Sequence, residues 1–78
     1  MIQEELEKVL AKYLDEDGDI IEDGFDEDVI KYFNGIGVRG VTNTEEMFDS
    51  PGIDIYSYSI AWEENNKLNM VTYRRVYC

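Results

Sequence analysis

Residues 15–28 constrain the fold of this chain more than any other segment. They read DEDGDIIEDGFDED and contain nine acidic residues, two glycines and no basic residue. Carboxylates at this density predict a segment in contact with solvent, because acidic side chains are seldom buried without partners. The two glycines interrupt helical structure, so the segment is expected to begin with a loop that separates two ordered elements. We expect Ile20 and Ile21 to hold this loop against the core.

The residues before this segment have the periodicity of an amphipathic helix over 2–14. Apolar side chains recur at a spacing of three or four residues, which places them on one helical face. They are Ile2, Leu6, Val9, Leu10, Tyr13 and Leu14. We expect the helix to bury four of them against a sheet: Leu6, Val9, Leu10 and Tyr13.

A second helix is predicted to begin near Asp26. An Asp at this position is a good N-cap, and Glu27 and Asp28 suit the first turn, where the helix dipole favours negative charge. Asn34 and Gly35 form a typical C-terminal stop. Helix capping alone therefore gives a structural explanation for two of these three acidic residues.

The second half of the chain is predicted to form strands. Residues 53–62 and 68–77 are rich in β-branched and aromatic side chains, and the polar residues 63–67 between them indicate a hairpin. A short strand is expected over 38–42 and a single helical turn over 44–48. Pro51 followed by Gly52 is typical of a type II turn.

These elements predict one α+β domain over residues 1–78. Two N-terminal helices should pack on a small antiparallel β-sheet that ends in a C-terminal hairpin. A chain of 78 residues has room for one domain with a thin core. Its 44% content of hydrophobic residues is too high for a disordered acidic tail.

The charge of the chain limits its partners. Eighteen acidic and seven basic residues give a net charge of −11. Residues 1–34 carry a net charge of −9, from twelve acidic residues and three lysines, whereas residues 35–78 carry −2. Such a charge argues against direct binding to nucleic acid or to anionic lipid, which both require basic surfaces.

The cysteine content and the lack of an apolar segment indicate a cytoplasmic protein. A lone cysteine, Cys78, cannot form an internal disulfide, which favours a reducing compartment. Pairing between molecules through Cys78 is the alternative. No apolar run is long enough to span a membrane, and no signal segment is expected.

The residues that most enzymes use are missing. The chain has no histidine, which removes the commonest general base and the arrangements that pair it with Ser or Cys. One cysteine and no histidine also exclude a tetrahedral zinc site. We therefore expect neither catalysis nor a cofactor.

The start of the acidic segment resembles a calcium-binding EF-hand loop. Asp15, Asp17 and Asp19 occupy its first three ligand positions. The sixth position should be glycine and is Ile20, and the twelfth should be a bidentate Glu and is Asp26. A divalent-metal module with a degenerate loop over 15–28 is the alternative function.

The leading hypothesis is a negative surface that binds a basic protein. Duplex DNA presents one charge per about 1.7 Å of axis, and nine carboxylates within 14 residues approach that density. The predicted binding residues are these acids and two tyrosines: Asp15, Glu16, Asp17, Asp19, Glu22, Asp23, Asp26, Glu27, Asp28, Tyr56 and Tyr58. The tyrosines would supply contact area, or would instead face the core as cross-strand pairs.

Small acidic phage proteins, including anti-CRISPR and anti-restriction inhibitors, are similar in size and charge, although no motif here assigns one family. This similarity of class implies inhibition of a CRISPR effector or a restriction enzyme by a mimic of DNA or RNA. An immunity protein that blocks a nuclease toxin would present the same surface. A solvated loop kept polar for solubility is the simplest alternative.

Overall fold

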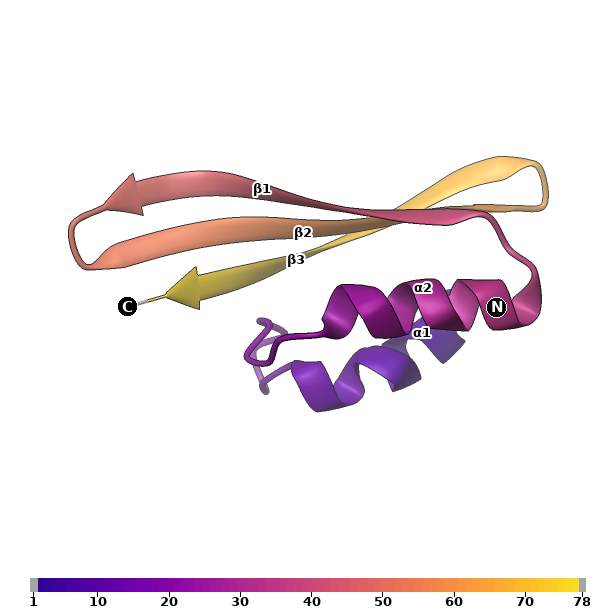
Figure 1. Cartoon of the computed structure of the whole chain (residues 1–78), viewed down its shortest axis with the longest axis horizontal. Coiled ribbons are helices and arrows are strands. Elements are labelled where there is room, and N and C mark those ends of the chain that lie inside the picture. The colour runs from indigo at the N-terminus through magenta and orange to yellow at the C-terminus, as the bar shows by residue number, and fades with distance from the viewer. Residues whose placement is uncertain (1, 78) are drawn as a thin grey trace.

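The computed structural model describes residues 2–77 and has two layers. Two helices lie against one face of a three-stranded antiparallel sheet, whose strands follow the order β1-β2-β3 (Figure 1). The elements are α1 (Ile2–Leu10), a 3-10 turn (Ala11–Tyr13), α2 (Phe25–Ile36), β1 (Gly40–Ser50), β2 (Ile53–Glu64) and β3 (Lys67–Tyr77). The predicted α+β class, with two helices before an antiparallel sheet, is confirmed.

The first helix is shorter than the predicted span 2–14. Regular α-helix ends at Leu10, and the next three residues tighten into a 3-10 turn, which is common at helix ends. Leu14 is already extended and forms a β-bridge with Ile20. Leu6, Leu10 and Tyr13 are buried as expected, whereas Val9 is only half-buried.

The second helix begins and ends at glycines rather than at the predicted residues. Gly24 is the N-cap, with φ of 93°, and Asp26 lies inside the first turn without capping it. The helix continues past Asn34 to Ile36, and Gly37 takes the left-handed conformation with φ of 70°. Its N–H donates to the Asn34 carbonyl and the next N–H, of Val38, to Phe33, which is the Schellman motif.

The strand predicted over 38–42 exists but is longer than expected, and the helical turn predicted over 44–48 was wrong. Residues 40–50 form one continuous strand, β1, so the expected helical turn over 44–48 does not exist. Thr44 looks like a helix cap in isolation, but pairing with β2 along the whole strand overrides that local preference. A β-bulge between Glu46 and Phe48 adds one residue, Met47, to this strand.

Both hairpins have turns of two residues. Gly52 has φ of 89°, as the third residue of a type II turn requires, so the predicted Pro-Gly turn is supported. The loop predicted over 63–67 is shorter, because Glu64 pairs with Lys67. Asn65 and Asn66 have φ of 56° and 64°, the pattern of a type I′ turn, which matches the twist of the strands.

The core lies between the helices and the inner face of the sheet, which is the face that the helices cover. Ile60 and Trp62 from β2 are buried there against α1 and α2, and the Phe33 and Trp62 rings lie 6.0 Å apart. At the other end of the sheet, the β1–β2 hairpin projects beyond the helical layer (Figure 1). Inner-face residues of this hairpin are therefore not covered by a helix.

Candidate functional site: an acidic surface beside the projecting hairpin

The acidic loop between the helices is held together by its own first residue. Asp15 Oδ1 accepts hydrogen bonds from the backbone N–H groups of Asp17 and Asp19, both at 2.9 Å. The Asp15 N–H also donates to the Asp19 carbonyl at 2.9 Å, and Gly18 has φ of 82°. Asp15 thus stabilises a tight turn, a common role for Asp.

Two consecutive arginines of β3 fasten this loop to the sheet. Arg74 donates to Asp19, with its Nη2 2.9 Å from Oδ2. Arg75 Nη1 lies 2.6 Å from Asp23 Oδ1 and also donates to the Glu22 carbonyl at 3.2 Å. Sequence reasoning missed both arginines as partners, because their contacts span more than 50 residues of chain. Asp19 and Asp23 are therefore already paired within the molecule.

Asp28 also has partners inside the fold. Its carboxylate accepts a hydrogen bond from the Tyr13 hydroxyl and lies 3.2 Å from the Lys12 ammonium. The Tyr13 hydrogen bond, followed by the Lys12 hydrogen bond, lowers the pKa of Asp28. The same bond raises the pKa of Tyr13. Asp28 thus joins the 3-10 turn to α2.

The remaining predicted acids are free. Within residues 2–77, no ion pair engages the side chains of six of the nine; one of these, Asp15, accepts the hydrogen bonds of the turn, which leaves five. These five are exposed: Glu16, Asp17, Glu22, Asp26 and Glu27. The predicted acidic segment is therefore divided between acids that hold the fold together and acids that face solvent.

The degenerate EF-hand loop does not bring the carboxylates of Asp15, Asp17 and Asp19 together around one point. Asp15 uses one carboxylate oxygen for the turn, and Asp19 is bound to Arg74. In the part of the chain that the structure describes, one group of three acidic residues has ligand oxygens within 4.8 Å of one another, and it lies elsewhere. This group, which we call the hairpin triad, consists of Glu46, Asp49 and Asp54.

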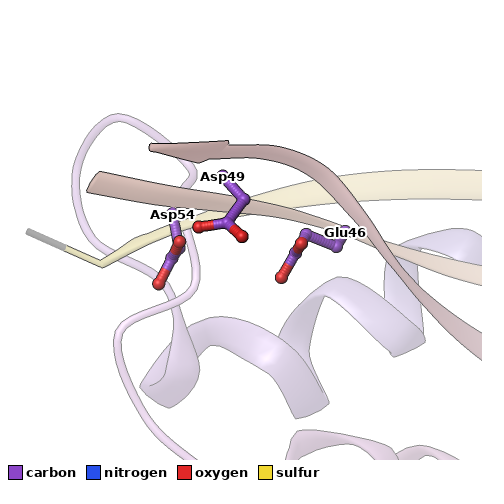
Figure 2. Close-up of side chains that lie close together, drawn as sticks. All are labelled: Glu46, Asp49 and Asp54. Atoms are coloured by element: carbon purple, nitrogen blue, oxygen red, sulfur yellow. The ribbon is translucent and has the colours of Figure 1, made fainter. Parts of the chain in front are cut away.

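The β-bulge explains the hairpin triad. Because the chain gains one residue at Met47, Glu46 and Asp49 both point to the inner face and occupy neighbouring positions on it. Asp54 of β2 is directly opposite Asp49. Figure 2 shows the three side chains gathered at the end of the hairpin. Three hard oxygen ligands are of the kind that Ca²⁺ or Mg²⁺ prefers.

The hairpin triad is electrostatically unfavourable. A hydrogen bond shared with Asp49 raises the pKa of Asp54, and partial burial and the charges of Asp49 and Glu46 raise it further. Like charges directly opposite one another on neighbouring strands destabilise a sheet. Sequence reasoning missed this cluster, although a signal was present: Asp49 and Asp54 flank the Pro-Gly turn at positions that a two-residue hairpin places opposite one another.

The two predicted tyrosines both lie on the inner face, in different surroundings. Tyr58 is half-buried and stacks on Phe25, with ring centroids 5.2 Å apart, so it belongs to the edge of the core. Tyr56 lies further along β2, where its ring meets that of Tyr77 edge-on at 5.5 Å. A hydrogen bond with Glu46 raises the pKa of the Tyr56 hydroxyl. Tyr56 is therefore the one that adjoins the hairpin triad.

The free acids of the loop and the hairpin triad belong to one surface. Glu46, Tyr56 and Arg75 form a single row across the three strands, and Arg75 binds the loop at Glu22 and Asp23. Adjacent strands lie about 4.8 Å apart, so two strand spacings separate Glu46 from Arg75, whose side chain contacts the loop.

A hollow of about 230 Å³ lies between the loop and the sheet and is lined by Glu22, Asp23, Gly24, Phe25, Asp26, Thr44, Tyr58 and Arg75. Thr44 precedes Glu46 on the same face of β1. Glu22 and Asp26 line this hollow, and Glu27 lines a neighbouring one together with Asp26. We define the acidic surface as these three free acids together with the hairpin triad. Its six members are Glu22, Asp26, Glu27, Glu46, Asp49 and Asp54.

Comparison of the chain with protein-family models, with curated proteins and with solved structures gives no match. Neither helix within residues 2–77 is long and apolar enough to cross a membrane. Cys78 lies outside the described residues.

Proposed function

We propose that this protein binds and inhibits a basic nucleic-acid-binding protein, and that the acidic surface occupies the site of the nucleic acid. The observation that supports this proposal most is the convergence of two acidic segments distant in sequence. Glu22, Asp26 and Glu27 come from the first half of the chain, and the hairpin triad comes from the second.

The spacing of the charges suits a phosphate-binding groove. Neighbouring positions on one face of a strand are about 7 Å apart and neighbouring strands about 5 Å apart. Carboxylates at these separations come within about a factor of two of the charge spacing along one strand of a duplex, which is about 3.4 Å of axis. A surface of this sign also steers a basic partner toward it and raises the association rate.

The partner classes that fit this chemistry are CRISPR effectors, restriction enzymes and nuclease toxins. All of them hold nucleic acid in grooves rich in Lys and Arg, where an acidic protein competes for the same contacts. Tyr56 lies between the hairpin triad and Tyr77, where its ring would add contact area to a charged interface.

The test is inhibition of nucleic-acid cleavage across a panel of these three classes, at low and at high salt. Two charge-neutralised variants divide the acidic surface: E22Q/D26N/E27Q and E46Q/D49N/D54N. Asp19 and Asp23 stay unchanged, because their loss would release the loop from Arg74 and Arg75. The matched control is E4Q/E5Q/E7Q, which removes three charges from exposed positions of α1.

We expect both test variants to lose inhibition and the control to keep it. Each single neutralisation should weaken binding by at most about fivefold, because exposed ion pairs contribute little individually. Higher salt should weaken the wild-type complex. If all three variants inhibited as strongly as the wild type and inhibition did not depend on salt, the charges of this surface would not be responsible for binding.

The calcium alternative is tested separately by calorimetric titration. Micromolar binding with one site per chain would favour a metal module over an inhibitor. Binding abolished by D17N would place the ion in the loop over 15–28, whereas binding abolished by E46Q/D49N/D54N would place it at the hairpin triad.

A further inference from the structure

The sheet face opposite the helices, which we call the outer face, is uncovered (Figure 1). Alternation along the paired strands assigns its residues, because directly opposite residues share a face. Five large apolar side chains on it are at least half exposed: Val41 (61%), Met47 (61%), Phe48 (50%), Leu68 (80%) and Met70 (66%). Single exposed apolar residues are ordinary, but a gathering of them on one face indicates an interaction site.

The bulge contributes to this face. Met47 lines a shallow hollow with Ile55, Ser57 and Thr72, which places its side chain on the outer face beside Phe48. The apolar side chains consequently form two groups, one at each end of the sheet. The first consists of Val41, Ala61, Leu68 and Met70, and the second of Met47, Phe48, Ile55 and Val76. Between the two groups lie small polar residues, among them Ser59 and Thr72, whose hydroxyl oxygens are 3.3 Å apart.

Few charged residues lie on the outer face. The register of the strands places only Glu45, Glu63 and Arg74 on it, a net charge of −1 out of the −11 of the whole chain. The other charged groups lie on the helices, in the loops or on the inner face. For two copies of this chain, the outer faces are therefore the surfaces that meet with the least repulsion.

We propose that two copies of this chain form a symmetric dimer by packing their outer faces together. A two-fold axis that runs across the strands near Ser57 and Ser59 places each apolar group over the opposite group of the second copy. The same operation sets Glu45 over Asn43 and Arg74 over Thr72 of the second copy, so no like charges face one another. Sheets stacked in this way pack about 10 Å apart, with their strands inclined by about 30°.

The available area is large enough for a specific dimer interface. Three strands of 11 or 12 residues give a face about 36 Å long and about 14 Å wide, or about 500 Å² before side chains are counted. Two such faces bury more than about 1,000 Å², the lower limit for a specific interface. The proposed dimer does not depend on the proposed inhibitory function.

Pairing of the free β1 edges is the competing way to join two copies. Full antiparallel overlap of two β1 strands would set Glu45 opposite Glu45 of the second copy, and opposed like charges destabilise a sheet. The outer-face dimer avoids this contact, which is why it is the arrangement proposed.

Sedimentation equilibrium of the full chain, from about 1 to 200 µM in reducing buffer, tests the proposal. The reductant removes any disulfide through Cys78. The variant is V41K/M70K, which places charge in one apolar group, and the matched control is I36K, an exposed apolar residue of α2 on the other side of the molecule. Fluorescence of Trp62 verifies that each variant is folded.

We expect the wild-type mass to rise from 9.1 kDa toward twice that value with concentration. The V41K/M70K variant should dissociate at least tenfold more readily, and the I36K variant should match the wild type. Higher salt should strengthen the dimer, because it screens the repulsion between two acidic chains. A wild-type chain that stays monomeric at 200 µM would overturn the proposal, as would a dimer that V41K/M70K leaves unchanged.

Discussion

Replacement of Gly40 by alanine tests the packing of the sheet on α2 most directly. A Cβ atom built at Gly40 would lie 2.5 Å from Cε2 of the Phe33 ring and still closer to Cδ2, whereas carbon atoms normally approach to about 3.5–4.0 Å. Phe33 is 1% exposed and packs against Trp62, so its ring has little room to turn away. The clash must therefore be relieved by separating β1 from α2.

Overpacking of this kind costs about 1–3 kcal/mol. For a domain of this size, each kcal/mol lowers the melting temperature by about 4–8 °C. The matched control is G35A, because Gly35 lies within α2 and a Cβ there meets no atom within 4 Å. Alanine at an open helical position should stabilise the protein by about 0.5–1 kcal/mol.

The assay is urea unfolding followed by the fluorescence of Trp62, which is buried at 2% exposure. The G40A variant should unfold at a lower urea concentration than wild type and G35A at a higher one. A smaller side chain in F33L should partly relieve the clash, so the costs of G40A and F33L should be less than additive. Equal midpoints for G40A and wild type would refute the close contact between β1 and α2.

Three further predictions concern the core and the charges. L10A should lower the free energy of unfolding by about 2–5 kcal/mol in the same urea assay, because Leu10 is fully buried, and exposed Q3A should have little effect. The pKa of Asp28 is lower in the folded state than in the unfolded state. Its charged form therefore stabilises the fold fully above the unfolded-state pKa, and this stabilisation is lost as the pH falls through the folded-state pKa. Urea midpoints between pH 2 and 7 should consequently depend less on pH in D28N than in wild type. Asp54 has a raised pKa, so its charge opposes folding at neutral pH, and D54N should raise the midpoint at pH 7 but not at pH 3.

The secondary structure could be predicted wherever a periodic pattern coincided with packing against the core. The apolar repeat of residues 2–14 identified the first helix, and the alternation in 53–62 and 68–77 identified two strands. The ends of the helices were predicted less well, because Gly24 and Gly37 were preferred over the polar caps at Asp26 and Asn34. The strand β1 was missed over most of its length, since its sequence has weak β-propensity and its structure depends on pairing with β2.

The candidate site was predicted only in part, for a physical reason. A run of charges in the sequence indicates where carboxylates are abundant, but not which of them find cations in the fold. Asp19, Asp23 and Asp28 proved to be paired with Arg74, Arg75 and Lys12. Such contacts depend on the register of β3 and on the position of the loop, which local sequence does not encode.

The arrangement of the hairpin triad argues that the acidic surface does more than keep the protein soluble. Solubility needs charge at the surface, but it does not require Asp49 and Asp54 to be opposite one another or Glu46 to be brought beside them by a bulge. This arrangement costs stability, as the raised pKa of Asp54 indicates. Clusters of like-charged residues that destabilise the folded state are common at functional surfaces, where the arrangement that binding requires is not the most stable one. A basic partner would remove that repulsion on binding, so a surface strained in the free protein is also one that gains most from a partner of opposite charge.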